Sequence, residues 1–233
     1  INKQPQNGGC FFLTSVYMNH AIWTLRAAFT CLGLMFGTWL GLIPWMRDTR
    51  ALTHEQVGLA LLCAGVGGLL TFPLVRHLLA RVGSAKLVVA SGIAMAVCLP
   101  FIAIAPSLLW LSVSLFAVGI PAATMDVAIN AQAVVQERQA KQSLMARFHA
   151  CWSLGALTGA LAAVVALSWH VPLWIFMAMV GTVCGLGLWL NRHALLQEKR
   201  DANTPRRAPR LQLNARVLLV GSIVVCAYMV EGA

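Results

Sequence analysis

Charged side chains are scarce in this sequence of 233 residues. Asp, Glu, Lys and Arg make up 10% of the chain, whereas a soluble globular domain carries roughly 25%. So few charges cannot cover a surface that faces water on all sides. The composition therefore argues against a soluble enzyme and against a secreted domain.

The chain also lacks the patterns that would indicate chemistry. It contains no G-x-S-x-G, no H-E-x-x-H and no phosphate-binding loop, so we expect no enzyme, no metal site and no cofactor. No two of its cysteines are close in sequence, and six of the seven lie in separate apolar segments, as packing residues do. They are Cys10, Cys31, Cys63, Cys98, Cys151, Cys184 and Cys226.

Long apolar stretches dominate what is present, since hydrophobic residues make up 59% of the chain. A helix needs about 20 apolar residues to cross a hydrocarbon core of roughly 30 Å. A helix also satisfies its own backbone hydrogen bonds in lipid, which an open sheet cannot do. The sequence predicts an all-α transmembrane bundle with six spans, at about 27–46, 56–75, 87–105, 108–135, 145–167 and 173–190.

The segments around this 27–190 bundle differ from it. Residues 1–26 are predicted to be a cytoplasmic N-terminal segment, and since the chain begins at Ile1, Met18 is an alternative start that would make residues 1–17 non-native. Residues 191–215 form a basic linker with two prolines. Residues 216–233 are predicted to be a truncated seventh helix, which suggests the first half of a larger protein.

The basic residues set the orientation. All of the 17 Lys and Arg residues except Arg47 and Arg50 fall on the side of the N-terminus and the linker. Basic loops stay in the cytoplasm, so this side is expected to be cytoplasmic. The membrane rule also explains the net charge of +10 better than nucleic-acid binding does, and no nucleic acid is expected as a partner.

The stretch between the second and third spans carries a family motif. Residues 76–86 read RHLLARVGSAK, and Leu78, Arg81, Gly83 and Lys86 match a G-x-L-x-D-R-x-G-R-R pattern whose acidic position is Ala80 here. With the six-helix half and the basic linker, this resembles the N-terminal half of the major facilitator superfamily. The resemblance implies a cytoplasmic gate, for which the candidates are Arg81, Gly83, Glu137 and Arg138.

Three further stretches are similar to a mostly uncharacterised bacterial inner-membrane branch of that superfamily. They are residues 125–138 with 143–155, the pairs Gly37–Trp39 and Ile43–Pro44, and residues 231–233. The resemblance implies a multi-pass transporter of the bacterial inner membrane, with a small solute and a missing C-terminal half as partners.

A polar stripe follows the fourth predicted span. Asp126 and Asn130 lie four residues apart and hence on one helix face. Such a face should meet a water-filled cavity or other helices, because a charge facing lipid is costly. Either the pair handles a proton, cation or polar substrate, or it is a buried hydrogen-bonding pair that fixes the fourth helix to the fifth. Both interpretations stay open.

Three more residues are candidates for the substrate or ion pathway. His149 is either a proton relay, since histidine changes charge near neutral pH, or a packing residue. Glu231 is the only acid in the seventh apolar run, and Trp39 lies towards the end of the first span. The sequence thus predicts a secondary transporter that works by alternating access, with a proton as a candidate coupling ion; the alternative is a non-transporting assembly factor or sensor.

Overall fold

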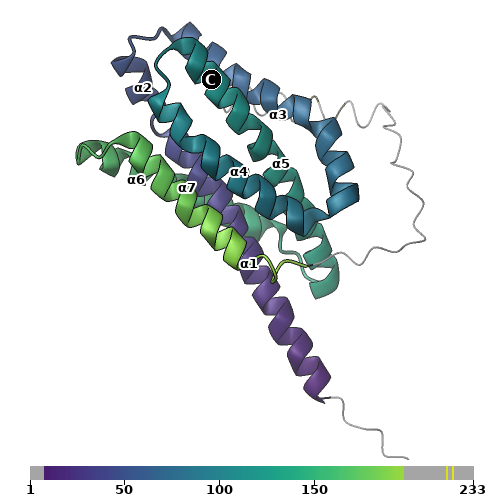
Figure 1. Ribbon diagram of the computed structural model, residues 1–233. Coiled ribbons are helices and arrows are strands. Elements are labelled where there is room, and N and C mark those ends of the chain that lie inside the picture. Colours follow the sequence, from purple (N-terminus) through teal and green to yellow (C-terminus); the bar gives the residue numbers. More distant parts are fainter. Residues whose placement is uncertain (1–7, 197–218, 220–221, 223–233) are drawn as a thin grey trace, which may run out of the picture. The chain divides into compact units, whose positions relative to one another are not determined.

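The structure is a computed structural model, and it describes residues 8–196 together with Leu219 and Ser222. Glu231, and the predicted seventh helix apart from Leu219 and Ser222, lie outside these residues. The described part contains seven α-helices and no strand (Figure 1). They are α1 (Gly8–Leu40), α2 (Ile43–Thr49), α3 (His54–Val82), α4 (Ser84–Ile104), α5 (Leu108–Ala140), α6 (Met145–Ser168) and α7 (Leu173–Leu190).

Six segments among the described residues are candidates for crossing the membrane. Five are α3 to α7, and the sixth is Met18–Thr49, which joins most of α1 to α2. Each is long and apolar enough to cross a bilayer. The predicted all-α bundle of six transmembrane helices is confirmed.

The first helix differs most from the expected bounds. It begins at Gly8, well before residue 27, and Asn19 and His20 do not interrupt it because both lie exposed on its surface. It stops at Leu40, and the chain resumes as α2 after a turn. Pro44 explains the break, since a proline lacks the N–H group and its ring clashes with the carbonyl four residues earlier.

The most extensive helix contacts join α1 with α6, α3 with α5, and α4 with both α7 and α5 (Figure 1). In the first pair, Gly33 and Gly37 face the α6 backbone at Trp152 and Ala156 so closely that a Cβ would overlap it. The glycines spaced by four thus permit direct backbone contact, as expected for membrane helices. Phe29 and Phe148 stack beside this contact with ring centroids 5.4 Å apart.

Candidate functional site

Asp126 and Asn130 form a hydrogen-bonded pair within α5. The Asn130 side-chain nitrogen Nδ2 donates to Asp126 Oδ1 at 3.2 Å and to the Asp126 main-chain carbonyl at 2.9 Å. Asn130 is half-buried, whereas Asp126 is exposed on the surface of the bundle. The pair therefore lies on one helix face and bonds within its own helix.

His149, at the start of α6, lies near this pair. Its exposed ring meets Phe29 of α1 edge-on, with centroids 5.5 Å apart, and it interacts electrostatically with Asp126. The structure thus brings together Asp126, Asn130 and His149, three of the residues predicted from the sequence. They gather where α1, α5 and α6 meet.

Arg26 is a membrane-embedded charge that the sequence reasoning assigned to the loop side. The structure places it inside the Met18–Thr49 segment, half-buried, with its guanidinium 4.6 Å from the centre of the Trp23 ring. Its Nε atom is buried and has no hydrogen-bond partner among the described residues. The sequence reasoning missed this position because polar residues before residue 27 hid the fact that the first helix is continuous there.

Arg26 lies at nearly the same depth as Asn130. Gln136 of α5 bonds to Ala21 of α1, which aligns the two helices at that level. Counted from this bond, Arg26 is about 7.5 Å along α1 and Asn130 is about 9 Å along α5, at about 1.5 Å per residue. Asp126 is about 15 Å along α5 from the same bond, so Arg26 and Asp126 lie within about two helical turns of depth.

Two buried glutamines of α5 tie helix ends together, and the sequence reasoning missed both. Gln136 Nε2 donates to the Ala21 carbonyl at 3.0 Å. Gln132 Nε2 donates to Ser84 Oγ at 2.8 Å and to the Leu196 carbonyl at 2.7 Å. Both side chains are fully buried. Their spacing of four in an otherwise apolar helix was the available signal.

Glu137, a gate candidate, caps the next helix. Its Oε1 atom accepts backbone hydrogen bonds from Leu144 at 2.6 Å and Met145 at 2.8 Å, at the start of α6. A carboxylate there satisfies free N–H groups and complements the helix dipole. Arg138, the following residue, is exposed.

The other two gate candidates lie at the junction of α3 and α4. Arg81 is exposed in the last turn of α3. Gly83 joins the two helices with a φ of 82°, a backbone conformation that side chains other than glycine rarely adopt. Gly83 is therefore required by the turn itself, whatever else this loop does.

Trp39 lies in the helix core. It is 4% exposed, and its ring meets Phe36 edge-on with centroids 5.2 Å apart. Around it an apolar pocket is lined by residues of α1, α2, α3 and α5, including Met46 and Leu115. Its indole N–H has no hydrogen-bond partner in the described part of the chain.

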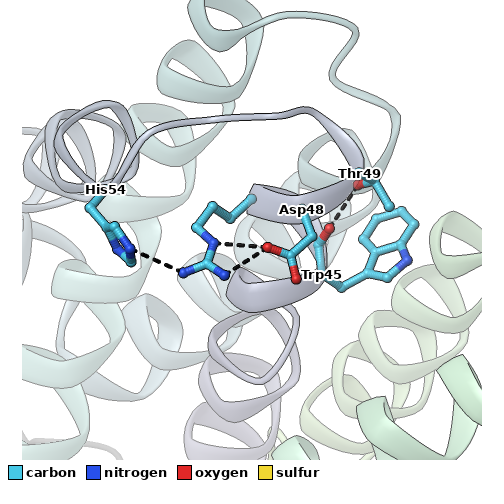
Figure 2. Close-up of polar contacts among 5 residues, drawn as sticks. Trp45, Asp48, Thr49 and His54 are labelled. Carbon is cyan, nitrogen blue, oxygen red and sulfur yellow. Dashed lines mark hydrogen bonds and ion pairs between the residues drawn. The ribbon is translucent and has the colours of Figure 1, made fainter.

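Arg47 and Arg50, the two basic residues on the side away from the N-terminus, both have hydrogen-bond partners. The Arg47 guanidinium forms an exposed ion pair with Asp48 at 2.8 Å and lies 3.3 Å from His54 Nε2. Asp48 and His54 are labelled in Figure 2. Arg50 donates to the carbonyls of Ala103 at 2.9 Å and Ala105 at 3.1 Å, at the end of α4. Partial burial lowers the pKa of Arg50 from its usual value.

Comparison with known proteins places the whole described bundle in one family. The model of the Major Facilitator Superfamily matches residues 25–231. The match thus covers the Asp126 region, five of the six spans in full and the first span from residue 25 onward.

Bacterial relatives agree with this match. An uncharacterised MFS-type transporter of Yersinia pestis is 29% identical over 89% of this chain and 54% of its own length. The uncharacterised transporter y4wD of Sinorhizobium fredii is 30% identical, over 89% and 55% respectively. The membrane protein MosC of Rhizobium meliloti is 25% identical, over 86% and 49%. The chain spans about half the length of the relatives it matches.

Proposed function

Because this chain belongs to the major facilitator superfamily, a family of transporters, we propose that it is half of a secondary transporter of the bacterial inner membrane. It would move a small solute by alternating access between two six-helix halves. The share of about half of each relative's length supports a second half. The distribution of basic residues supports a cytoplasmic N-terminus.

One observation carries the proposal, namely the exposed carboxylate of Asp126 on a membrane-spanning helix. Ionisable groups in such helices face the bundle interior or a water-filled cavity, because facing lipid is costly. Asp126 is exposed among the described residues. It is therefore proposed to face an aqueous pathway between this half and the second one.

Proton coupling is proposed at the same place. Asp126 and His149 lie close enough to interact electrostatically. Histidine changes charge near neutral pH, which suits a relay between the two sides of a membrane. Asn130 supports the charged carboxylate by donating to it. Arg81 and Gly83, at the α3–α4 turn, are proposed to belong to the cytoplasmic gate.

Thiol labelling tests the aqueous pathway. In a variant without the seven native cysteines, Asn130→Cys would react with a membrane-impermeant maleimide, because a thiol needs water to ionise. Val183→Cys is the control, since Val183 is 67% exposed on the apolar surface of α7. We expect Asn130→Cys to react at least about tenfold faster. Equal rates would contradict the pathway.

Transport itself is tested on the complete protein in vesicles. A panel of small solutes is screened for uptake under an imposed pH gradient, and the solute found is then measured with Asp126→Asn. We expect the variant to fold and to lose gradient-driven uptake. Uptake that keeps its rate and its dependence on the gradient would refute the role of Asp126.

A further inference from the structure

A groove of about 520 Å³ runs between α4 and α7. Ala96 and Gly181 lie at its floor, where the two helices approach so closely that a Cβ on Gly181 would meet the Ala96 carbonyl at 2.6 Å. Val97 and Leu186 line the groove and are 62% and 53% exposed. Small residues at the contact and large ones beside it thus create a channel on the surface.

The surroundings of this groove are hydrocarbon. Both helices are membrane-spanning, and no charged residue lines the groove. Along α7 it extends from Ala178 to Trp189, about 17 Å at about 1.5 Å per residue. One leaflet is about 15 Å deep, half of a core of roughly 30 Å. The groove therefore matches the depth of one leaflet.

A cation lies at the end of the groove. Arg192 is half-buried against Trp189, with its guanidinium 4.2 Å from the ring centre and one nitrogen donating to the Trp189 carbonyl at 2.7 Å. Trp189 and Arg192 follow each other at the end of α7, as residues of a membrane interface do. The exposed Lys86, in the first turn of the antiparallel α4, adds a second positive charge at this end.

We propose that this groove binds an anionic phospholipid. One acyl chain lies in the groove over Ala96 and Gly181, and the phosphate accepts hydrogen bonds from Arg192. A guanidinium has five N–H donors in a planar fork that suits phosphate, and Trp189 holds it in place. The charge of Lys86 favours a headgroup with a net negative charge over a zwitterionic one.

The test measures lipid retained by the complete protein, with native mass spectrometry after titration with phosphatidylglycerol or phosphatidylcholine. We expect tighter binding of phosphatidylglycerol, and about tenfold weaker binding of it in Arg192→Ala, as for loss of a charge-assisted hydrogen bond. Arg138→Ala is the control, because Arg138 is exposed at the end of α5. Equal loss in both variants, or no preference between the lipids, would overturn the headgroup assignment.

Filling the groove tests the acyl-chain site separately. Thr182 lines the groove and its neighbour Val183 lies outside it. Thr182→Phe should reduce retention of both lipids, while Val183→Phe, which adds the same bulk to the same helix, should retain them as the unaltered protein does. If Thr182→Phe melts at the same temperature as Val183→Phe and still retains lipid fully, the groove is not the binding site.

Discussion

The side-chain amide of Gln136 in α5 donates a hydrogen bond of 3.0 Å to the main-chain carbonyl of Ala21 in α1. The two residues are 115 positions apart in the chain, and both are completely buried. In this position the amide fixes the depth of one transmembrane helix against another. The relative levels of Arg26, Asp126 and Asn130 depend on it.

Replacing Gln136 with leucine should therefore destabilise the bundle. The Ala21 carbonyl would keep its helical bond but lose a buried donor, at a cost of about 0.5–1.5 kcal/mol, as for a typical intramolecular hydrogen bond. Thermal unfolding in detergent measures the change. Gln139→Leu serves as control, because Gln139 is exposed three residues further along α5. Equal melting temperatures for the two variants would show that the amide does not fix the helices.

Gly37 is expected to tolerate no side chain. A Cβ there would overlap the Ala156 carbonyl group of α6, so Gly37→Ala must separate α1 from α6. We expect a loss of about 1–3 kcal/mol, as for overpacking, and less monodisperse protein on size-exclusion chromatography. Gly65→Ala is the matched control, since no atom lies within 4 Å of that Cβ, and should be neutral or slightly stabilising. A stable Gly37→Ala would disprove the close packing.

Glu137 is expected to act through its acceptor oxygen. Glu137→Ala removes the acceptor of the Leu144 and Met145 N–H groups and should lower the stability. Glu137→Gln keeps an oxygen that can accept the same N–H groups, so it should cost less. Chemical denaturation of the purified protein compares the two variants. If glutamine proved as damaging as alanine, the negative charge and not the hydrogen bond would be responsible.

Arg50 should matter more than Arg47 for stability. Arg50→Ala leaves the carbonyls at the end of α4 without two charge-assisted hydrogen bonds, each worth about 1.5–3 kcal/mol. Arg47→Ala breaks an exposed ion pair, for which about 0–1 kcal/mol is usual. Melting temperatures at low and high salt distinguish them. Only the small Arg47 effect should vanish with salt, and a salt-sensitive Arg50 effect would contradict the buried bonding.

His149 is expected to set the pH dependence of transport, on the proposed function. Histidine can carry a positive charge and glutamine cannot, and His149 interacts electrostatically with Asp126. His149→Gln should flatten the pH profile of uptake near neutral pH. His170→Gln, at the exposed turn between α6 and α7, should leave the profile unchanged. Two identical profiles for the variants would exclude His149 from coupling.

The bundle was predictable because the bilayer imposes it. A hydrocarbon core sets the length and apolarity of each span, and both can be read from one sequence without knowledge of neighbours. The glycine spacing in α1 likewise indicated close packing, which Gly33 and Gly37 show against α6. The Asp126–Asn130 pair followed from helix geometry alone.

The remaining features depend on partners that are distant in sequence. Gln132 and Gln136 are important through Ser84, Leu196 and Ala21, which no local pattern connects to them. Arg26 was assigned to a loop because polar neighbours lowered the apolarity of a segment that is nevertheless helical. Hydropathy averages the polarity of all residues in a segment. A polar residue that faces outward from the helix, as Asn19 and His20 do, lowers this average without interrupting the helix.

The bond from Gln132 to the Leu196 carbonyl also changes the reach of the chain beyond α7. That helix ends at Leu190, but the amide secures Leu196 to α5 and α4 together. Any tether that leaves this bundle is therefore measured from Leu196 and not from Asn191. The five residues that follow Asn191, up to Leu196, could span roughly 17 Å if extended, at about 3.5 Å per residue, and the hydrogen bond at Leu196 makes this length unavailable to such a tether.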